Sequence, residues 1–73
     1  MWQRPDNEEE AEADRLLREG NPLAARDIYL AMFERGRGTN LNHLLLKLAD
    51  AYWLLGDLEK EKEIREAFYG SLP

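Results

Sequence analysis

Glycine residues divide this chain of 73 residues into four stretches of similar length, and each stretch has the apolar spacing of an amphipathic helix. These glycines are Gly20, Gly36, Gly38, Gly56 and Gly70. Because glycine adopts the left-handed backbone at a helix end without strain, each of these positions predicts that a helix stops nearby. The spacing therefore predicts helices over residues 8–19, 22–35, 41–55 and 57–69.

Polar residues at the predicted helix starts support these boundaries. Asn21 can accept hydrogen bonds from free backbone amides, and Pro22 suits the first helical position because its torsion is already fixed. The capping residues expected for the first, third and fourth helices are Asp6 or Asn7, Thr39 or Asn40, and Asp57. Since short connections make neighbouring helices antiparallel, we expect an all-α fold of two antiparallel helical hairpins. It forms a single domain over residues 8–70, with tails at 1–7 and 71–73.

The third predicted helix is apolar on nearly every face and has to be covered on several sides. The other helices of so short a chain cover only part of it, which leaves Leu46 and Trp53 as candidates for contact with a partner. Packing in the core is the alternative for Trp53. The last helix is less apolar, and the residues expected to dock it are Leu58, Ile64, Ala67 and Phe68.

Charge argues against a nucleic-acid partner. The formal net charge is -5, and the acidic side chains are concentrated in the first and last predicted helices. Glu8, Glu9 and Glu10 lie in the first turn of the first helix, where the helix dipole favours negative charge, and we expect them to be solvated. Because Lys and Arg supply most nucleic-acid affinity, a chain without a basic face is a poor binder.

The chain contains no cysteine, so its fold rests on packing rather than on disulfides. Its first residues lack the apolar stretch of a secretory signal, and Lys47 interrupts the longest apolar run. We therefore expect a cytoplasmic protein without a membrane segment.

The two predicted hairpins resemble each other. Residues 16–21 (Leu-Leu-Arg-Glu-Gly-Asn) align with residues 52–57 (Tyr-Trp-Leu-Leu-Gly-Asp) at an offset of 36 positions. The second copy has large, small, aromatic, glycine and capping positions at Leu45, Leu48, Ala49, Tyr52, Gly56 and Asp57, and the first copy has Ala13, Leu16, Gly20, Ala25 and Tyr29 at equivalent spacing. With this pattern and period, the chain resembles about two tetratricopeptide repeats. The resemblance implies right-handed stacking of the hairpins.

In tetratricopeptide proteins the first helix of each repeat lines a concave groove that holds a peptide or a partner helix. The resemblance therefore implies a partner-binding groove formed by Asp14, Leu17, Arg18, His43, Leu46, Asp50 and Trp53. Trp53 is the expected anchor, because a large ring gives much contact area for little loss of entropy. The acidic Asp50 beside it favours a partner with apolar and basic contacts, such as an amphipathic helix.

Catalytic chemistry has little support in the sequence. A nucleophilic triad needs a nucleophile and a base, but the chain offers only Ser71 and His43, and His43 fits a surface or capping position. The glycines around Arg37 lack the continuation of a phosphate-binding loop. We therefore expect no enzyme activity, no metal and no cofactor. A catalyst built around His43 is a remote alternative.

These observations predict a protein-interaction module, either an adaptor or a small chaperone that shields an apolar segment of another protein. The alternative is a self-assembling structural subunit, natural or designed, that forms a homo-oligomer and has no separate ligand.

Overall fold

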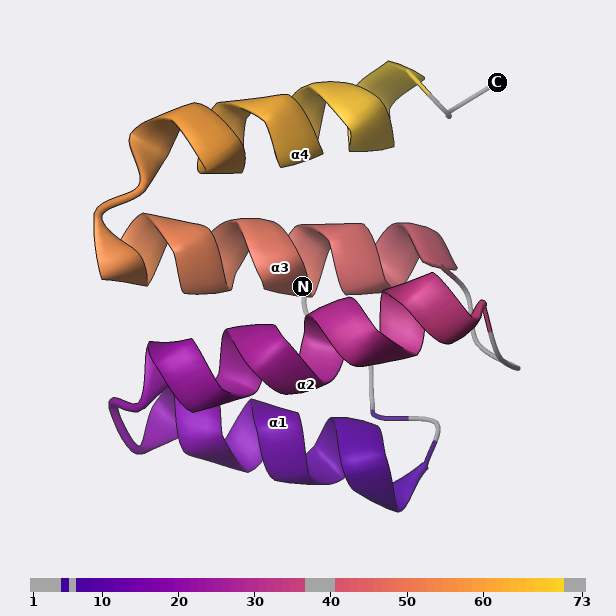
Figure 1. Ribbon diagram of the computed structural model, residues 1–73, viewed down its shortest axis with the longest axis vertical. Coiled ribbons are helices and arrows are strands. Elements are labelled where there is room, and N and C mark those ends of the chain that lie inside the picture. The colour runs from indigo at the N-terminus through magenta and orange to yellow at the C-terminus, as the bar shows by residue number, and fades with distance from the viewer. Residues whose placement is uncertain (1–4, 6, 37–40, 71–73) are drawn as a thin grey trace.

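The computed structural model describes residue 5 and residues 7–36 and 41–70. This part of the chain forms four helices: α1 (Glu8–Arg18), α2 (Pro22–Arg35), α3 (Leu41–Leu55) and α4 (Leu58–Gly70). Successive helices run antiparallel and pack against one another in chain order, from α1 at one edge to α4 at the other (Figure 1). The predicted all-α class is confirmed, and every helix boundary agrees with the prediction to within one residue.

Helix α1 begins at a side-chain cap. The side-chain oxygen of Asn7 accepts a hydrogen bond from the backbone nitrogen of Glu10 at 2.8 Å, which satisfies one of the free amides of the first turn. Asn7 is thus a cap of α1, as predicted. The other residue considered there, Asp6, and the caps predicted for α3, Thr39 and Asn40, lie outside the described residues.

The two hairpins use the same turn. Gly20 and Gly56 both take the left-handed backbone, with φ of 85° and 82°. The residue after each glycine, Asn21 or Asp57, donates a backbone hydrogen bond five positions back along the preceding helix, at 2.9 and 3.0 Å. Because these bonds recur at the offset of 36 seen in the sequence, the internal similarity has a structural counterpart at the turn.

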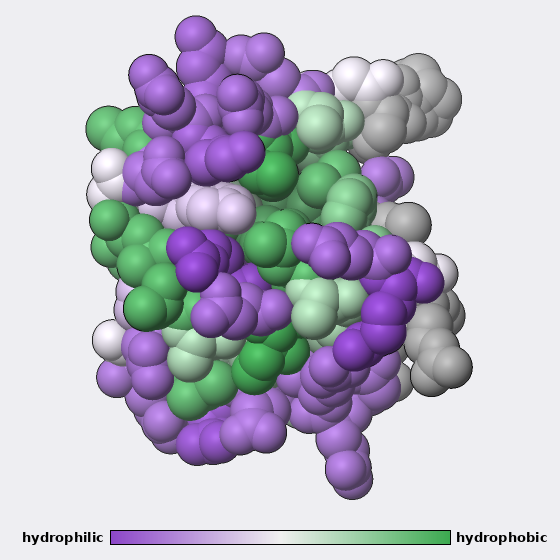
Figure 2. Space-filling view, viewed as in Figure 1, coloured by the Kyte–Doolittle hydropathy of each residue, from purple (hydrophilic) through white to green (hydrophobic). Residues whose placement is uncertain are grey.

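The core lies between the first three helices. Its buried apolar residues are Ala13 and Leu17 of α1, Ala25, Tyr29 and Met32 of α2, and Leu44, Leu48, Ala51 and Tyr52 of α3. The small residues among them let helix backbones approach, and the large ones fill the space opposite. Apolar surface is visible over the middle of the molecule, where α2 and α3 lie, with hydrophilic side chains above and below it (Figure 2).

Helix α4 covers α3 without any fully buried side chain of its own. Ile64 and Phe68 are half-buried, as expected of residues that dock the helix. Leu58 is 58% exposed and Ala67 is exposed as well, so the prediction that these two residues dock α4 is wrong. Within the described residues, no helix has both the length and the apolar character needed to cross a membrane.

Candidate functional site

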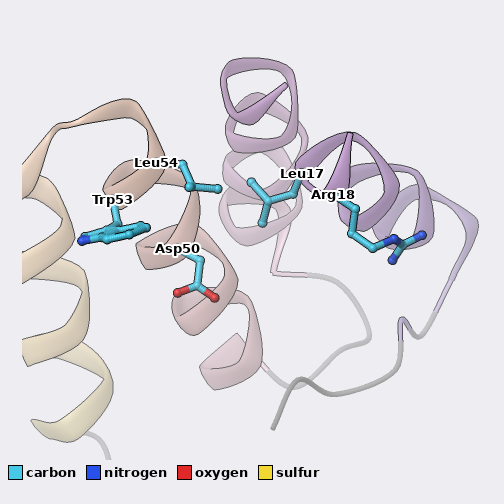
Figure 3. A pocket seen from close by; sticks show the side chains of 5 residues that line it. All are labelled: Leu17, Arg18, Asp50, Trp53 and Leu54. Carbon is cyan, nitrogen blue, oxygen red and sulfur yellow. The ribbon is translucent and has the colours of Figure 1, made fainter. Parts of the chain in front are cut away.

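An open hollow of about 330 Å³ lies between the end of α1 and the second half of α3. It is lined by Leu17, Arg18, Asp50, Trp53 and Leu54, and four of these five are residues that the sequence predicts for a partner-binding groove. Leu17 and Leu54 point toward each other from the two helices, and Trp53 lies beyond Leu54 on the side of α4 (Figure 3). The first helix of each hairpin therefore contributes to one concave surface.

The floor of the hollow is apolar and accessible. Trp53 is 59% exposed and Leu54 is 50% exposed, whereas the neighbouring Leu17 is buried. The core alternative for Trp53 is therefore wrong. Leu54 was not among the predicted groove residues, and the apolar excess of α3 is the signal that could have identified it, because some of that surface had to remain uncovered.

Asp50 lies in the hollow but is already paired. Its Oδ1 accepts a hydrogen bond from the Nη2 of Arg65 on α4 at 3.0 Å, and the Nε of Arg65 also donates to Glu61. The hydrogen bond to Glu61 and, secondarily, the one to Asp50 hold the pKa of the Arg65 guanidinium above its ordinary value. Arg65 therefore stays charged and ties α4 to the edge of the hollow.

Asp14 does not line the hollow. It is only 3% exposed, and its Oδ2 lies 2.8 Å from the Nζ of Lys47, while the hydroxyl of Tyr29 donates a hydrogen bond to Oδ1. The expectation that Asp14 faces a groove is wrong, because the carboxylate turns inward to compensate a buried ammonium group.

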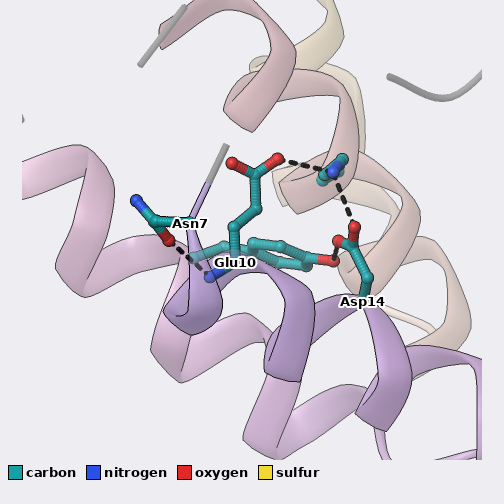
Figure 4. Close-up of polar contacts among 5 residues, drawn as sticks. Asn7, Glu10 and Asp14 are labelled. Atoms are coloured by element: carbon teal, nitrogen blue, oxygen red, sulfur yellow. Dashed lines mark hydrogen bonds and ion pairs between the residues drawn. The ribbon is translucent and has the colours of Figure 1, made fainter. Parts of the chain in front are cut away.

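Glu10 completes the same buried network. It is 2% exposed, and its Oε2 lies 2.6 Å from the Nζ of Lys47. Figure 4 shows Glu10 and Asp14 directing their carboxylates from α1 to a common point. The expectation that Glu10 is solvated is therefore wrong, although Glu8 and Glu9 are exposed as expected.

The network joins three helices. The Lys47 ammonium group lies between the carboxylates of Glu10 and Asp14, and the Tyr29 hydroxyl donates a further hydrogen bond to Asp14. Burial and, after it, the hydrogen bond to Asp14 raise the pKa of Tyr29 far above its ordinary value, so Tyr29 stays neutral. No buried side-chain nitrogen or oxygen among the described residues lacks a hydrogen-bond partner. Such a network specifies how α1, α2 and α3 fit together.

Sequence reasoning missed Lys47 and Glu10 as structural partners. The signal was present, because Lys47 lies on an almost wholly apolar helix that was expected to be covered on several sides. A buried lysine requires an acidic partner. Glu10 and Asp14 are four positions apart, so they share one face of α1 and can supply it.

His43 and Leu46, the remaining predicted groove residues, are half-buried and lie outside the lining of the hollow. Both lie nearer the start of α3, the helix that carries Trp53. Among the described residues, no three His, Asp or Glu side chains are grouped in a way that could hold a metal ion.

Comparisons of the chain with protein-family models, with curated proteins and with solved structures found no match. The tetratricopeptide resemblance and the right-handed stacking that it implies therefore stay predictions from the sequence.

Proposed function

We propose that this chain is a non-enzymatic, cytoplasmic adaptor or small chaperone, built from two tetratricopeptide-like repeats, that binds an apolar or amphipathic segment of a partner protein. The observation that supports the proposal is the open hollow of about 330 Å³ with Trp53 and Leu54 exposed on its floor.

The chemistry of the hollow suits protein recognition. Its lining combines three apolar side chains with Arg18 and the already paired Asp50, and the described residues that form it include no serine, cysteine, histidine or lysine. A volume near the lower end of the range for ligand sites, about 300–1,000 Å³, suits one or two large side chains of a docked segment. Exposed tryptophan is a frequent anchor of such contacts, because burying its ring removes much apolar area from water.

A synthetic amphipathic peptide of 18 residues, with leucines on one face and glutamines on the other, tests this proposal. Its affinity for the chain is measured by fluorescence anisotropy of a label on the peptide. Trp53→Ala should weaken binding about fivefold or more, because a lost anchor costs more than about 1 kcal/mol. Leu23→Ala is the matched control, since Leu23 is 51% exposed on α2 and does not line the hollow. Equal affinities of the two variants would exclude the hollow as the binding site.

Self-assembly is the second candidate, and α4 is the observation that favours it. Leu58 and Tyr69 of this helix are 58% and 61% exposed, and no α4 residue is fully buried, so another copy could cover it. Light scattering across a wide concentration range separates the two functions. An adaptor should have the mass of a monomer or a weak dimer, whereas a structural subunit should have a constant oligomeric mass.

A further inference from the structure

The two charged residues of the hollow differ in what they offer a partner. Asp50 is engaged by Arg65 of α4 at 3.0 Å, and this cation also pairs with Glu61. Arg18 is exposed, and its side chain forms no ion pair or hydrogen bond with another described residue. Of the two charged side chains in the described lining of the hollow, Arg18 is therefore the one that remains available to a partner.

The neighbouring arginine of α1 shows that this difference is specific to Arg18. Arg15 is bracketed by Glu12 and Glu19, with guanidinium-to-carboxylate distances of 2.9 and 3.2 Å. Those two acids are directed to Arg15, which leaves none of them to pair with Arg18. In Figure 3 the Arg18 side chain extends away from Leu17, on the side opposite Trp53. Arg18 thus forms a free cationic rim next to an apolar floor.

Helix polarity offers a competing explanation for Arg18. It is the last residue of α1, where a positive charge interacts favourably with the negative end of the helix dipole. That effect would require no partner and would appear only in the stability of the protein. A binding measurement therefore distinguishes the two roles.

We propose that the partner is an amphipathic helix with an acidic flank. One large apolar side chain enters the hollow against Leu17, Trp53 and Leu54, and an Asp or Glu side chain one turn away pairs with Arg18. Residues three or four positions apart lie side by side on a helix, so one partner face can present both groups. Arginine suits this role because its guanidinium can bind a carboxylate through two hydrogen bonds. This inference rests on the proposed function and reverses the basic partner expected from Asp50 alone.

The net charge of -5 opposes an acidic partner at long range, so the preference must come from the local pair. Measurements at an ionic strength of about 0.15 M, where the screening length is roughly 8 Å, suppress the distant charges and keep the contact with Arg18.

Three peptides of identical apolar face test the inference, with Glu, Gln or Lys at the position one turn from the central leucine. Their affinities for the full chain are measured by fluorescence anisotropy. The Glu peptide should bind about twofold to fivefold more tightly than the Gln peptide, and the Lys peptide should bind most weakly. Arg18→Gln should remove the difference, and Arg18→Glu should reverse the order. Arg35→Gln is the matched control and should preserve it, because Arg35 pairs with Glu9 and does not line the hollow.

The outcomes separate this inference from the proposed function. Binding of all three peptides with equal affinity, or preference of the unaltered chain for Lys, would overturn the acidic partner while leaving the hollow as an apolar binding site. Failure of all three to bind would overturn both. If Trp53→Ala lowers the affinity of all three peptides, the peptides bind in the hollow. Unchanged circular dichroism of the Arg18 variants shows that any loss arises from the contact rather than from unfolding.

Discussion

Lys47 of α3 and Asp14 of α1 lie 33 positions apart in the chain and meet in the core, with 2.8 Å between Nζ and Oδ2. Glu10 approaches the same ammonium group at 2.6 Å. Since each of these side chains is almost inaccessible to water, the pairing compensates charges whose burial alone would be very costly.

Replacing Lys47 with Met should destabilise the protein by about 3–5 kcal/mol, because two buried carboxylates would remain without a cation. In a domain this small, such a loss is comparable to the whole free energy of unfolding. Urea unfolding followed by circular dichroism measures it. Lys62→Met is the control and should change stability by less than about 0.5 kcal/mol, since Lys62 is 78% exposed. A Lys47→Met variant as stable as that control would contradict the buried network.

Tyr29→Phe should cost about 1–3 kcal/mol at neutral pH, because Asp14 loses a buried hydrogen-bond donor. The same substitution should change how the stability of the protein depends on pH above neutrality. The folded state raises the pKa of Tyr29 above its ordinary value of about 10, so the folded protein holds this proton when the unfolded chain releases it. The contribution of Tyr29 to the free energy of unfolding is therefore fully present below pH 10. Above pH 10 it declines by about 1.4 kcal/mol per pH unit.

Denaturant unfolding between pH 8 and pH 11 tests this linkage. The parent chain should lose more stability over that range than the Tyr29→Phe variant, and parallel pH curves would contradict it.

Trp53→Ala should leave the free energy of unfolding within about 1 kcal/mol of the parent, because Trp53 is 59% exposed on the floor of the hollow. Leu44→Ala should cost about 2–5 kcal/mol, since Leu44 is completely buried in the same helix. Thermal unfolding of the two variants gives the comparison. A Trp53 variant as unstable as the Leu44 variant would place the tryptophan in the core.

Arg65→Gln should loosen α4 selectively, because Arg65 links this helix to Asp50 of α3. Both side chains are about one-third exposed, so the loss should be only about 0.2–1 kcal/mol. Amide hydrogen exchange should therefore become faster in α4 and remain unchanged in α1 and α2. Lys60→Gln removes a more exposed pair within α4 and should have a smaller effect. Uniform acceleration along the chain would show that Arg65 supports the whole fold instead.

Gly56→Ala should destabilise the protein by about 1–2 kcal/mol. The added methyl group would meet no atom within 4 Å, so the cost arises from the backbone, whose φ is 82°. Gly70→Ala provides the opposite case, because Gly70 lies in α4 without a positive φ and its added methyl group also meets nothing. That substitution should be neutral or stabilising by up to about 1 kcal/mol. Urea unfolding measures both variants. If Gly56→Ala and Gly70→Ala changed the free energy of unfolding equally, the positive φ of Gly56 would not be the cause of the cost.

The sequence by itself determined the local structure of this protein. The start of α1 at Asn7, the turns at Gly20 and Gly56 and the extents of all four helices were predictable, because caps, glycine conformation and apolar spacing act within a few neighbouring residues. The resemblance to tetratricopeptide repeats implied that Leu17 and Trp53 share one surface, and both line the hollow.

Only the tertiary structure decided which charged residues lie inside and which charges the hollow presents. Glu10 and Asp14 were expected on the surface, but they are buried because α1 turns this face toward Lys47. Asp50 was expected to attract a cationic partner, but it is engaged by Arg65 from α4. These pairings join residues far apart in sequence and depend on how each helix is rotated against the next. That rotation is set by the packing of the whole core rather than by local sequence pattern.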